Sequence, residues 1–225
     1  MISLLCPTRG RPAMFRNMLE SAWATAETKL EILAGIGGED TETAYKENYY
    51  GYDITGVHQT LLTGNFPATF VANDLASRAH GDLIFLVGDD TVFTTPHWDK
   101  PLLEHYARLN NKIHVYSLRD SRGEDGTPHP IATKEYVKAL GYLHTPIFNH
   151  FYPDTWMVEI AKANNCFTHM KDFLLLHNKP SDKGIFDETH TRIRSFGWLN
   201  RDMKVNETCQ HFLELEKQRL GKAMA

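Results

Sequence analysis

Two adjacent carboxylates, Asp89 and Asp90, follow a short apolar run after a single glycine, Gly88. The run, residues 83–87, is too short for a helix and is typical of a buried β-strand. In open α/β sheets, ligands bind outside the carboxyl ends of the strands. Adjacent carboxylate oxygens at that edge suit Mg²⁺ or Mn²⁺ bound to a diphosphate. A strand followed by an acidic turn is the alternative that this motif alone leaves open.

The composition is that of an ordinary globular protein. Of the 225 residues, 42% are hydrophobic and 23% are charged, and the formal net charge is -4. This net charge argues weakly against a protein that binds nucleic acid by bulk charge. No segment approaches the roughly 20 apolar residues that span a bilayer. The apolar residues 2–6 are too few for a signal peptide, so we expect a cytoplasmic protein. Three widely separated cysteines predict neither a disulfide framework nor a zinc cluster.

Strands and helices alternate over the first half of the chain. Helical spacing of apolar residues is found in residues 13–26, in the segment that Pro67 opens, and in residues 98–109. Short apolar runs predict strands at residues 2–6, 30–36, 57–62, 83–87 and 113–118. Alternation of this kind predicts an α/β fold with a mainly parallel sheet that is covered on both faces.

The pattern changes after residue 119. Residues 119–130 are rich in Gly, Pro and charge, which predicts a long loop that orders over a ligand, with a plain surface loop as the alternative. Further along, the sequence predicts helices at 133–140 and 155–164, a strand at 173–176 ending at His177, a polar loop at 178–194, and a last helix capped by Asn206. No linker separates the two halves, so we expect one domain.

The order of the acidic and histidine residues carries a family resemblance. Asp89 and Asp90 lie at one strand end, Asp154 stands directly before a predicted helix, and His177 lies at a later strand end. In this order they resemble the GT-A glycosyltransferases, in particular the inverting, family 2-like branch. The resemblance covers most of the chain. It implies one GT-A (Rossmann-like) domain over residues 1–225, with a mixed, mainly parallel sheet flanked by helices. Residues 1–118 would bind the nucleotide sugar, and residues 119–225 would form the acceptor side and the C-terminal helix.

The resemblance also implies roles for particular residues. Asp90 and His177 would hold Mn²⁺ or Mg²⁺, and Asp154 would be the general base that takes the proton of the acceptor hydroxyl. The donor would be a nucleotide sugar, in the first place a UDP-sugar. Arg9 and Arg11 suit a phosphate group because their guanidinium groups form charge-assisted hydrogen bonds. The expected donor-binding residues are Pro7, Thr8, Arg9, Arg11, Glu39, Asp40, Asn73 and Asp89.

Two positions depart from the family pattern. The family has an acid as the first residue of its Asp-x-Asp motif, and this chain has Gly88. The family also has an Asp after its second strand that reads the base. Here Gly37 and Gly38 occupy that place, and Glu39 and Asp40 follow. The division of roles between Asp89 and Asp90, and the identity of the base, are therefore open.

Each assignment has a structural alternative. Asp154 could cap the helix after it, His177 could be a hydrogen-bonded histidine at a strand end, and Arg9 and Arg11 could be solvated loop residues.

Two other functional classes also stay open. One is a sugar nucleotidyltransferase, although the chain lacks the Gly-x-Gly-Thr-Arg loop of such enzymes. The other is a non-catalytic module that binds sugar or nucleic acid.

The acceptor is not indicated by the sequence. Basic residues in the second half allow the hypothesis of a basic groove, with a hydroxymethylated DNA base as the acceptor. Acidic residues between them equally predict a solvated surface. The basic residues concerned are Arg119, Arg122, His129, Lys134, Lys179, Lys183, Arg192, Arg194 and Arg201.

Overall fold

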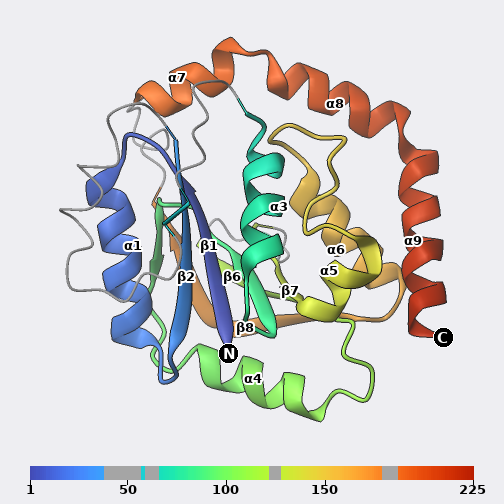
Figure 1. The fold of residues 1–225 in the computed structure, drawn as a ribbon, viewed down its shortest axis with the longest axis horizontal. Coiled ribbons are helices and arrows are strands. Elements are labelled where there is room, and N and C mark those ends of the chain that lie inside the picture. Colours follow the sequence, from blue (N-terminus) through green and yellow to red (C-terminus); the bar gives the residue numbers. More distant parts are fainter. Residues whose placement is uncertain (38–56, 59–65, 122–127, 179–186) are drawn as a thin grey trace.

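The computed structural model describes residues 1–37, 57–58, 66–121, 128–178 and 187–225. One sheet with the strand order β3-β2-β1-β4-β7-β6-β8-β5 runs through these residues, and helices pack on both of its faces (Figure 1). The strands are β1 Ile2–Thr8, β2 Leu30–Ile36, β3 Val57–His58, β4 Leu83–Leu86, β5 Thr91–Phe93, β6 Val115–Asp120, β7 Ile131–Thr133 and β8 Phe167–His177.

The helices come mostly between the strands and, after β8, in a run at the end of the chain (Figure 1). They are α1 Pro12–Thr25, α3 Ala68–Arg78, α4 Asp99–Arg108, α5 Lys134–Leu140, α6 Pro153–Ala163, α7 Glu188–Ser195, α8 Trp198–Thr208 and α9 Gln210–Met224. None of the described helices is both long and apolar enough to cross a membrane.

The sheet is mixed, as the sequence predicts. Strand β1 is parallel to β2 and β4, and β2 is parallel to β3. Strand β7 then runs antiparallel to both β4 and β6, whereas β8 is parallel to β6 and antiparallel to β5. The parallel strands of the first half therefore bring their carboxyl ends to one edge of the sheet, where a ligand site is expected.

Two hydrophobic cores cover the two faces of the sheet. In β1, Leu4 and Cys6 belong to one core and Leu5 to the other, because successive side chains of a strand point to opposite faces. The first core includes Phe15 of α1 and Leu102 of α4, and the second is built largely by α3, α5, α6 and α9. The prediction of a sheet covered on both faces is confirmed.

Several predicted boundaries differ from the structure. The segment 178–194 was expected to be a loop, but α7 occupies its end, and β8 begins six residues before the predicted strand. Asn206 does not cap a helix, because Cys209 is the N-cap of α9 and the Asn206 side chain accepts a hydrogen bond from Trp156 Nε1 at 2.7 Å. Strands β5 and β7, each of three residues, are too short for the sequence pattern to show. The rest of the predicted strand 57–62 and part of the predicted loop 119–130 lie outside the described residues.

Asp202 of α8 holds an irregular segment against the helix. Its fully buried carboxylate accepts hydrogen bonds from the backbone N–H groups of Asn149 at 3.1 Å, His150 at 2.9 Å and Phe151 at 3.0 Å. We expect Asp202→Ala to lower the free energy of unfolding by about 3 kcal/mol, because buried N–H donors are left unpaired. Urea denaturation measures this change. Asp172→Ala, which removes an exposed carboxylate, is the control, and equal stability of the two variants would contradict the role of Asp202.

Candidate functional site

A cavity of about 910 Å³ lies at the edge of the sheet where β1, β4 and β8 end. It collects side chains from segments that are far apart in the sequence. Among the residues that the sequence predicts, it is lined by Pro7, Thr8, Arg9, Arg11, Asp89, Asp90, Asp154 and His177. Most of the predicted site residues therefore share one cavity.

Three predicted donor-binding residues are not placed there. Glu39 and Asp40 lie outside the described residues. Asn73 of α3 does not line the cavity, because its side chain is used within the fold. It accepts hydrogen bonds from the backbone N–H groups of Leu143 at 3.0 Å and His144 at 2.9 Å, and it donates to the carbonyl oxygen of His144 at 2.7 Å. In the structure the Asn73 amide positions the turn that carries His144, and its contact with the donor stays a prediction.

Asp89 is a buried acid with two hydrogen-bond donors. Thr8 Oγ1 donates to Asp89 Oδ2 at 2.7 Å, and Arg11 Nη1 donates to Asp89 Oδ1 at 3.0 Å. Burial, together with the neighbouring negative charge of Asp90, raises the pKa of Asp89 to about 6, although Arg11 and Thr8 act in the opposite direction. Asp89 thus connects the end of β1 with the end of β4.

Arg11 is engaged by two carboxylates rather than left open for a ligand. Besides Asp89, it forms a bidentate pair with Asp187, with Nε to Oδ2 at 2.7 Å and Nη2 to Oδ1 at 3.0 Å. Asp187 stands directly before α7, and Thr189 Oγ1 in α7 donates to the Arg9 carbonyl at 2.9 Å. These contacts fix α7 to the loop after β1. The solvated-loop alternative is therefore wrong for Arg11, whose side chain is only 9% exposed.

Asp90 and His177 meet because two strands pair. Strand β5 begins directly after Asp90, and its antiparallel pairing with β8 sets Thr91 opposite His177. The Asp90 Oδ1 atom lies 3.5 Å from His177 Nε2. Burial, the largest influence, disfavours the charged carboxylate, but contact with His177 and the positive charges of His129 and Arg11 outweigh it. Together they hold the pKa of Asp90 well below its ordinary value. Asp90 is thus an ionised acid beside an imidazole nitrogen.

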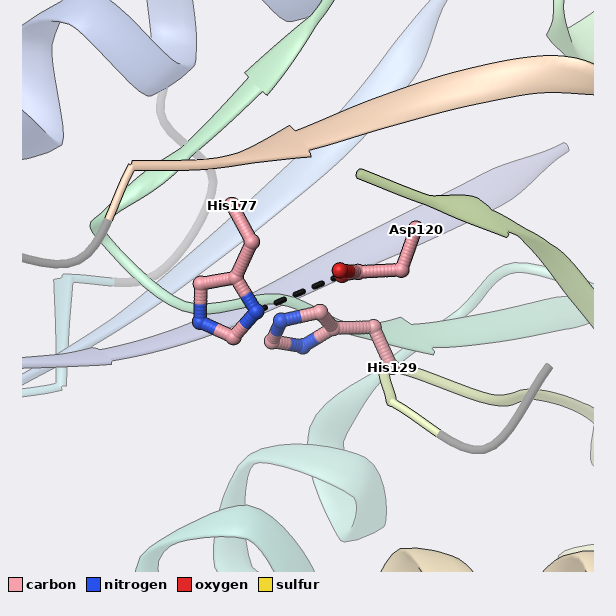
Figure 2. Close-up of side chains that lie close together, drawn as sticks. All are labelled: Asp120, His129 and His177. Atoms are coloured by element: carbon pink, nitrogen blue, oxygen red, sulfur yellow. Dashed lines mark ion pairs between the residues drawn. The ribbon is translucent and has the colours of Figure 1, made fainter. Parts of the chain in front are cut away.

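Asp120 and His129 stand beside His177 and were not predicted as site residues. Asp120 Oδ2 lies 3.3 Å from His177 Nδ1, and the two histidine rings have their centroids 4.9 Å apart (Figure 2). One nitrogen or oxygen atom from each of the three residues lies within 4.8 Å of the others, which is a spacing that a metal ion could use. Asp120 ends β6, so a strand prediction extended by two residues would have placed it at the edge of the sheet.

Gly88 has no side chain, and the Asp90 carboxylate occupies the space that a Cβ atom at residue 88 would need. A Cβ atom at residue 88 would collide with Asp90 Oδ1 and would lie 3.5 Å from His129 Cε1. A side chain at residue 88 would therefore require the Asp90 carboxylate to shift.

If Asp90 is a metal ligand, as the sequence predicts, Gly88→Ala should weaken Mn²⁺ binding about 10- to 100-fold, because the Asp90 carboxylate must shift. Gly88→Asp, which adds a third acid next to Asp89 and Asp90, should weaken binding too. Calorimetric titration measures both affinities. Gly37→Ala is the control, since a Cβ there meets the Arg9 side chain at no less than 3.4 Å. Tighter Mn²⁺ binding in Gly88→Asp would contradict this account.

Asp154 lies in the first turn of α6 and faces the cavity. The N-cap of this helix is Tyr152, so Asp154 is not the cap that the structural alternative proposed. Its Oδ1 atom accepts a hydrogen bond from the backbone N–H of Thr155 at 2.8 Å, and the side chain is half-buried. A negative charge is favourable at this end of a helix. The site therefore holds an anchored carboxylate on an element of the second half.

One wall of the cavity is aromatic and basic. The ring centroid of Trp198 lies 4.8 Å from that of Phe196 and 6.3 Å from that of His150. Arg192 and Arg194 of α7 line the same cavity. Other basic residues of the hypothetical groove do not: Lys134 donates to the Ala79 carbonyl at 3.4 Å, Arg201 pairs with Asp202, and Arg122, Lys179 and Lys183 lie outside the described residues. The basic character is thus confined to fewer residues than the sequence suggested.

No protein-family profile and no curated protein sequence matches this chain. Several solved structures do match its fold. S. aureus TarS 1–349 in complex with UDP-GlcNAc matches with a TM-score of 0.62 at 13% identity, over 79% of this chain and 59% of that one. A mannosyltransferase from Pyrobaculum calidifontis in complex with GDP-Man and Mn²⁺ matches with a TM-score of 0.58 at 13% identity, over 79% and 56% of the two chains.

Glucosyl-3-phosphoglycerate synthase from Mycobacterium tuberculosis, in complex with Mn²⁺, UDP and phosphoglyceric acid, matches with a TM-score of 0.57 at 14% identity, over 81% and 72% of the two chains. The match to the longer TarS structure covers only 37% of that chain, so this chain spans well under two thirds of the length of several of these proteins. Together with the strand order, the matches show that this chain has the fold of the GT-A glycosyltransferases.

Proposed function

We propose that this chain is a metal-dependent glycosyltransferase that moves a sugar from a nucleotide-sugar donor to an acceptor hydroxyl with inversion. One observation carries the proposal: a single cavity holds an ionised Asp90 beside His177 and, from the other half of the chain, the carboxylate of Asp154. A glycosyl transfer needs both kinds of group. Asp90 and His177 would hold a metal ion whose charge stabilises the leaving diphosphate, and Asp154 would accept the proton of the attacking hydroxyl.

The residues around Asp90 fit a divalent metal ion. A carboxylate and an imidazole suit Mn²⁺, and the 3.5 Å between Asp90 Oδ1 and His177 Nε2 is a separation that two ligands of one ion, each about 2.1 Å from it, can take. Both residues line the cavity, so a diphosphate has access to the same place. When bound there, Mn²⁺ or Mg²⁺ would supply the positive charge that stabilises the leaving diphosphate.

The residues of the chain itself would bind the donor and move the proton. Asp154 would take the proton from the acceptor hydroxyl as that oxygen attacks the anomeric carbon, on the side opposite the diphosphate. Inversion follows from this single displacement. The hydrogen bond from the Thr155 N–H would keep the carboxylate in position.

Donor binding would involve the loop after β1 and the end of β4. Pro7, Thr8, Arg9 and Asp89 line the cavity there and are the proposed donor contacts, with Glu39 and Asp40 as proposed contacts to the base. Arg11 would act mainly through Asp89 and Asp187, which already share its guanidinium. A UDP-sugar is the first donor to test and a GDP-sugar the second, since the structures of similar fold contain UDP, UDP-GlcNAc or GDP-Man.

The aromatic and basic wall supports an acceptor that combines a ring with negative charge. Trp198 and Phe196 offer faces for a sugar or a base, and Arg192 and Arg194 offer charge for a phosphate. A hydroxymethylated base in DNA has both properties, so it is the acceptor to test first. Affinity for DNA that is absent, or that does not fall with salt, would exclude it.

The proposal is tested by incubating the protein with UDP- and GDP-sugars and Mn²⁺, and measuring release of the nucleoside diphosphate with and without a chelator. Release that depends on Mn²⁺ and on the nucleotide sugar is expected. Binding of a nucleotide sugar without any turnover, across the panel of acceptors, would instead favour a binding module. Production of a nucleotide sugar from a nucleoside triphosphate and a sugar phosphate would identify a nucleotidyltransferase.

A further inference from the structure

His177 and the three polar residues around it differ in what they face. Asp90, His129 and His177 line the cavity, whereas Asp120 does not, and it is only 2% exposed. Asp120 therefore lies behind the histidines, on the side away from an incoming ligand. A buried carboxylate is unfavourable unless it is paired, and the pair observed for Asp120 is with His177 Nδ1 at 3.3 Å.

The two nitrogens of His177 face different acids. Nδ1 faces Asp120 Oδ2 at 3.3 Å, and Nε2 faces Asp90 Oδ1 at 3.5 Å. A neutral imidazole carries a proton on one nitrogen and a lone pair on the other. Only the nitrogen with the lone pair can bind a metal ion, so the acid that receives the N–H hydrogen decides which nitrogen is the ligand.

We propose that Asp120 is a positioning residue that fixes His177 as the Nδ1–H tautomer, so that the Nε2 lone pair points toward Asp90. This inference rests on the proposed function in assigning the metal ion to the Nε2 side. Carboxylates orient metal-binding histidines in general by accepting the hydrogen of the second ring nitrogen, and the 3.3 Å between Asp120 Oδ2 and His177 Nδ1 places the two atoms within reach of such a hydrogen bond.

The backbone around both residues supports a fixed relation between them. Asp120 pairs with Leu175 in the β6–β8 ladder, and the Ser121 N–H donates to the Leu175 carbonyl at 3.0 Å. The Ser121 hydroxyl in turn accepts a hydrogen bond from the His177 N–H at 2.9 Å. The register of β8 shifts between Leu118 and Arg119 of β6, upstream of these contacts. The strand ends that carry Asp120 and His177 are thus joined directly by hydrogen bonds.

A competing arrangement places the ion on the Nδ1 side, among Asp120, His129 and His177 (Figure 2). His129 adopts a left-handed backbone conformation with φ of 55°, which is uncommon for a residue other than glycine and is often found in functional sites. However, an ion there would need Asp120 as a ligand, and Asp120 does not reach the cavity that a nucleotide could enter. The geometry favours the Nε2 side.

Asp120→Asn separates these possibilities because it keeps the size of the side chain. An amide can donate to Nδ1 as readily as it accepts from it, so it no longer decides which nitrogen carries the proton. With the metal-free protein at a pH where the ring is neutral, ¹⁵N NMR should show the Nδ1–H tautomer of His177 in the wild type. The population of that tautomer should fall in Asp120→Asn, and calorimetry should show Mn²⁺ affinity about 10- to 100-fold lower. Asp172→Asn, at an exposed position of β8, is the matched control and should change neither.

Three results would overturn the inference. One is a wild-type His177 that is protonated on Nε2. Another is an Asp120→Asn variant in which both the tautomer and the Mn²⁺ affinity are unchanged. The third is His129→Gln losing as much Mn²⁺ affinity as His177→Gln, which would locate the ion on the Nδ1 side. A wild type that shows the Nδ1–H tautomer but binds no Mn²⁺ would contradict the proposed function while supporting the role of Asp120.

Discussion

Asp90→Asn is expected to reduce Mn²⁺-dependent transfer about 10³-fold, which corresponds to a loss of about 4 kcal/mol of transition-state stabilisation. The variant keeps the shape of the side chain but removes the charge that faces His177 Nε2 at 3.5 Å. Calorimetry should show weaker binding of Mn²⁺, and of the donor in its presence. The residual activity should be insensitive to a chelator.

His177→Gln is the partner variant and should show the same loss of Mn²⁺ dependence, since the two side chains would share one ion. Asp172→Asn, far from the cavity lining, controls for a general change of charge. If Asp90→Asn and His177→Gln both bind Mn²⁺ and donor with wild-type affinity, these two residues do not hold the metal.

Asp154→Asn is expected to reduce turnover about 10²- to 10⁴-fold, the range that general-base assistance contributes. An asparagine oxygen can still accept the hydrogen bond that Asp154 Oδ1 receives from the Thr155 N–H, so stability should change little. Donor affinity should also be close to that of the wild type, because Asp154 lies on α6 and acts on the acceptor. Steady-state kinetics measures the loss of turnover, and titration with the donor measures the donor affinity separately.

Glu159→Gln, on an exposed position of the same helix, is the control and should leave turnover unchanged. The anomeric configuration of the product gives an independent check, because a single displacement assisted by one base inverts it. Near-normal turnover in Asp154→Asn, or a product with the configuration of the donor, would exclude the proposed role.

The sequence predicted the parts of the site that follow short apolar runs. Asp90 follows β4 and His177 ends β8, and short apolar runs identify both positions. The fold class could be predicted for the same reason, since alternation of apolar runs and helical stripes is a local property of the chain. What the local pattern does not contain is the pairing of β5 with β8, which brings Asp90 and His177 together through a strand of only three residues.

The residues that were missed depend on contacts between distant segments. Asp120 was assigned to a loop because charge and glycine follow it, whereas its pairing with Leu175 extends the strand to include it. The hydrogen bonds between the Asn73 amide and the backbone of Leu143 and His144 also join distant segments, and no local pattern indicates them. Helix α7 is short and polar, and it is attached through Asp187 and Thr189 to the loop after β1.

The attachment of Arg11 to Asp187 has a consequence for how the protein acquires its site during synthesis. The two residues are 176 positions apart, and Arg11 and Asp89 are 78 positions apart. During synthesis Arg11 emerges before both of its acids. Asp89 can pair with it only after β4 has been made, and Asp187 only after the chain up to α7 has been made. Contacts of such long sequence separation form late, because closing the chain between them costs entropy that other contacts must first offset. The loop after β1 is therefore expected to be completed only once the segment that carries Asp187 has emerged, and a fragment of residues 1–118 would keep Arg11 without one of its two acids.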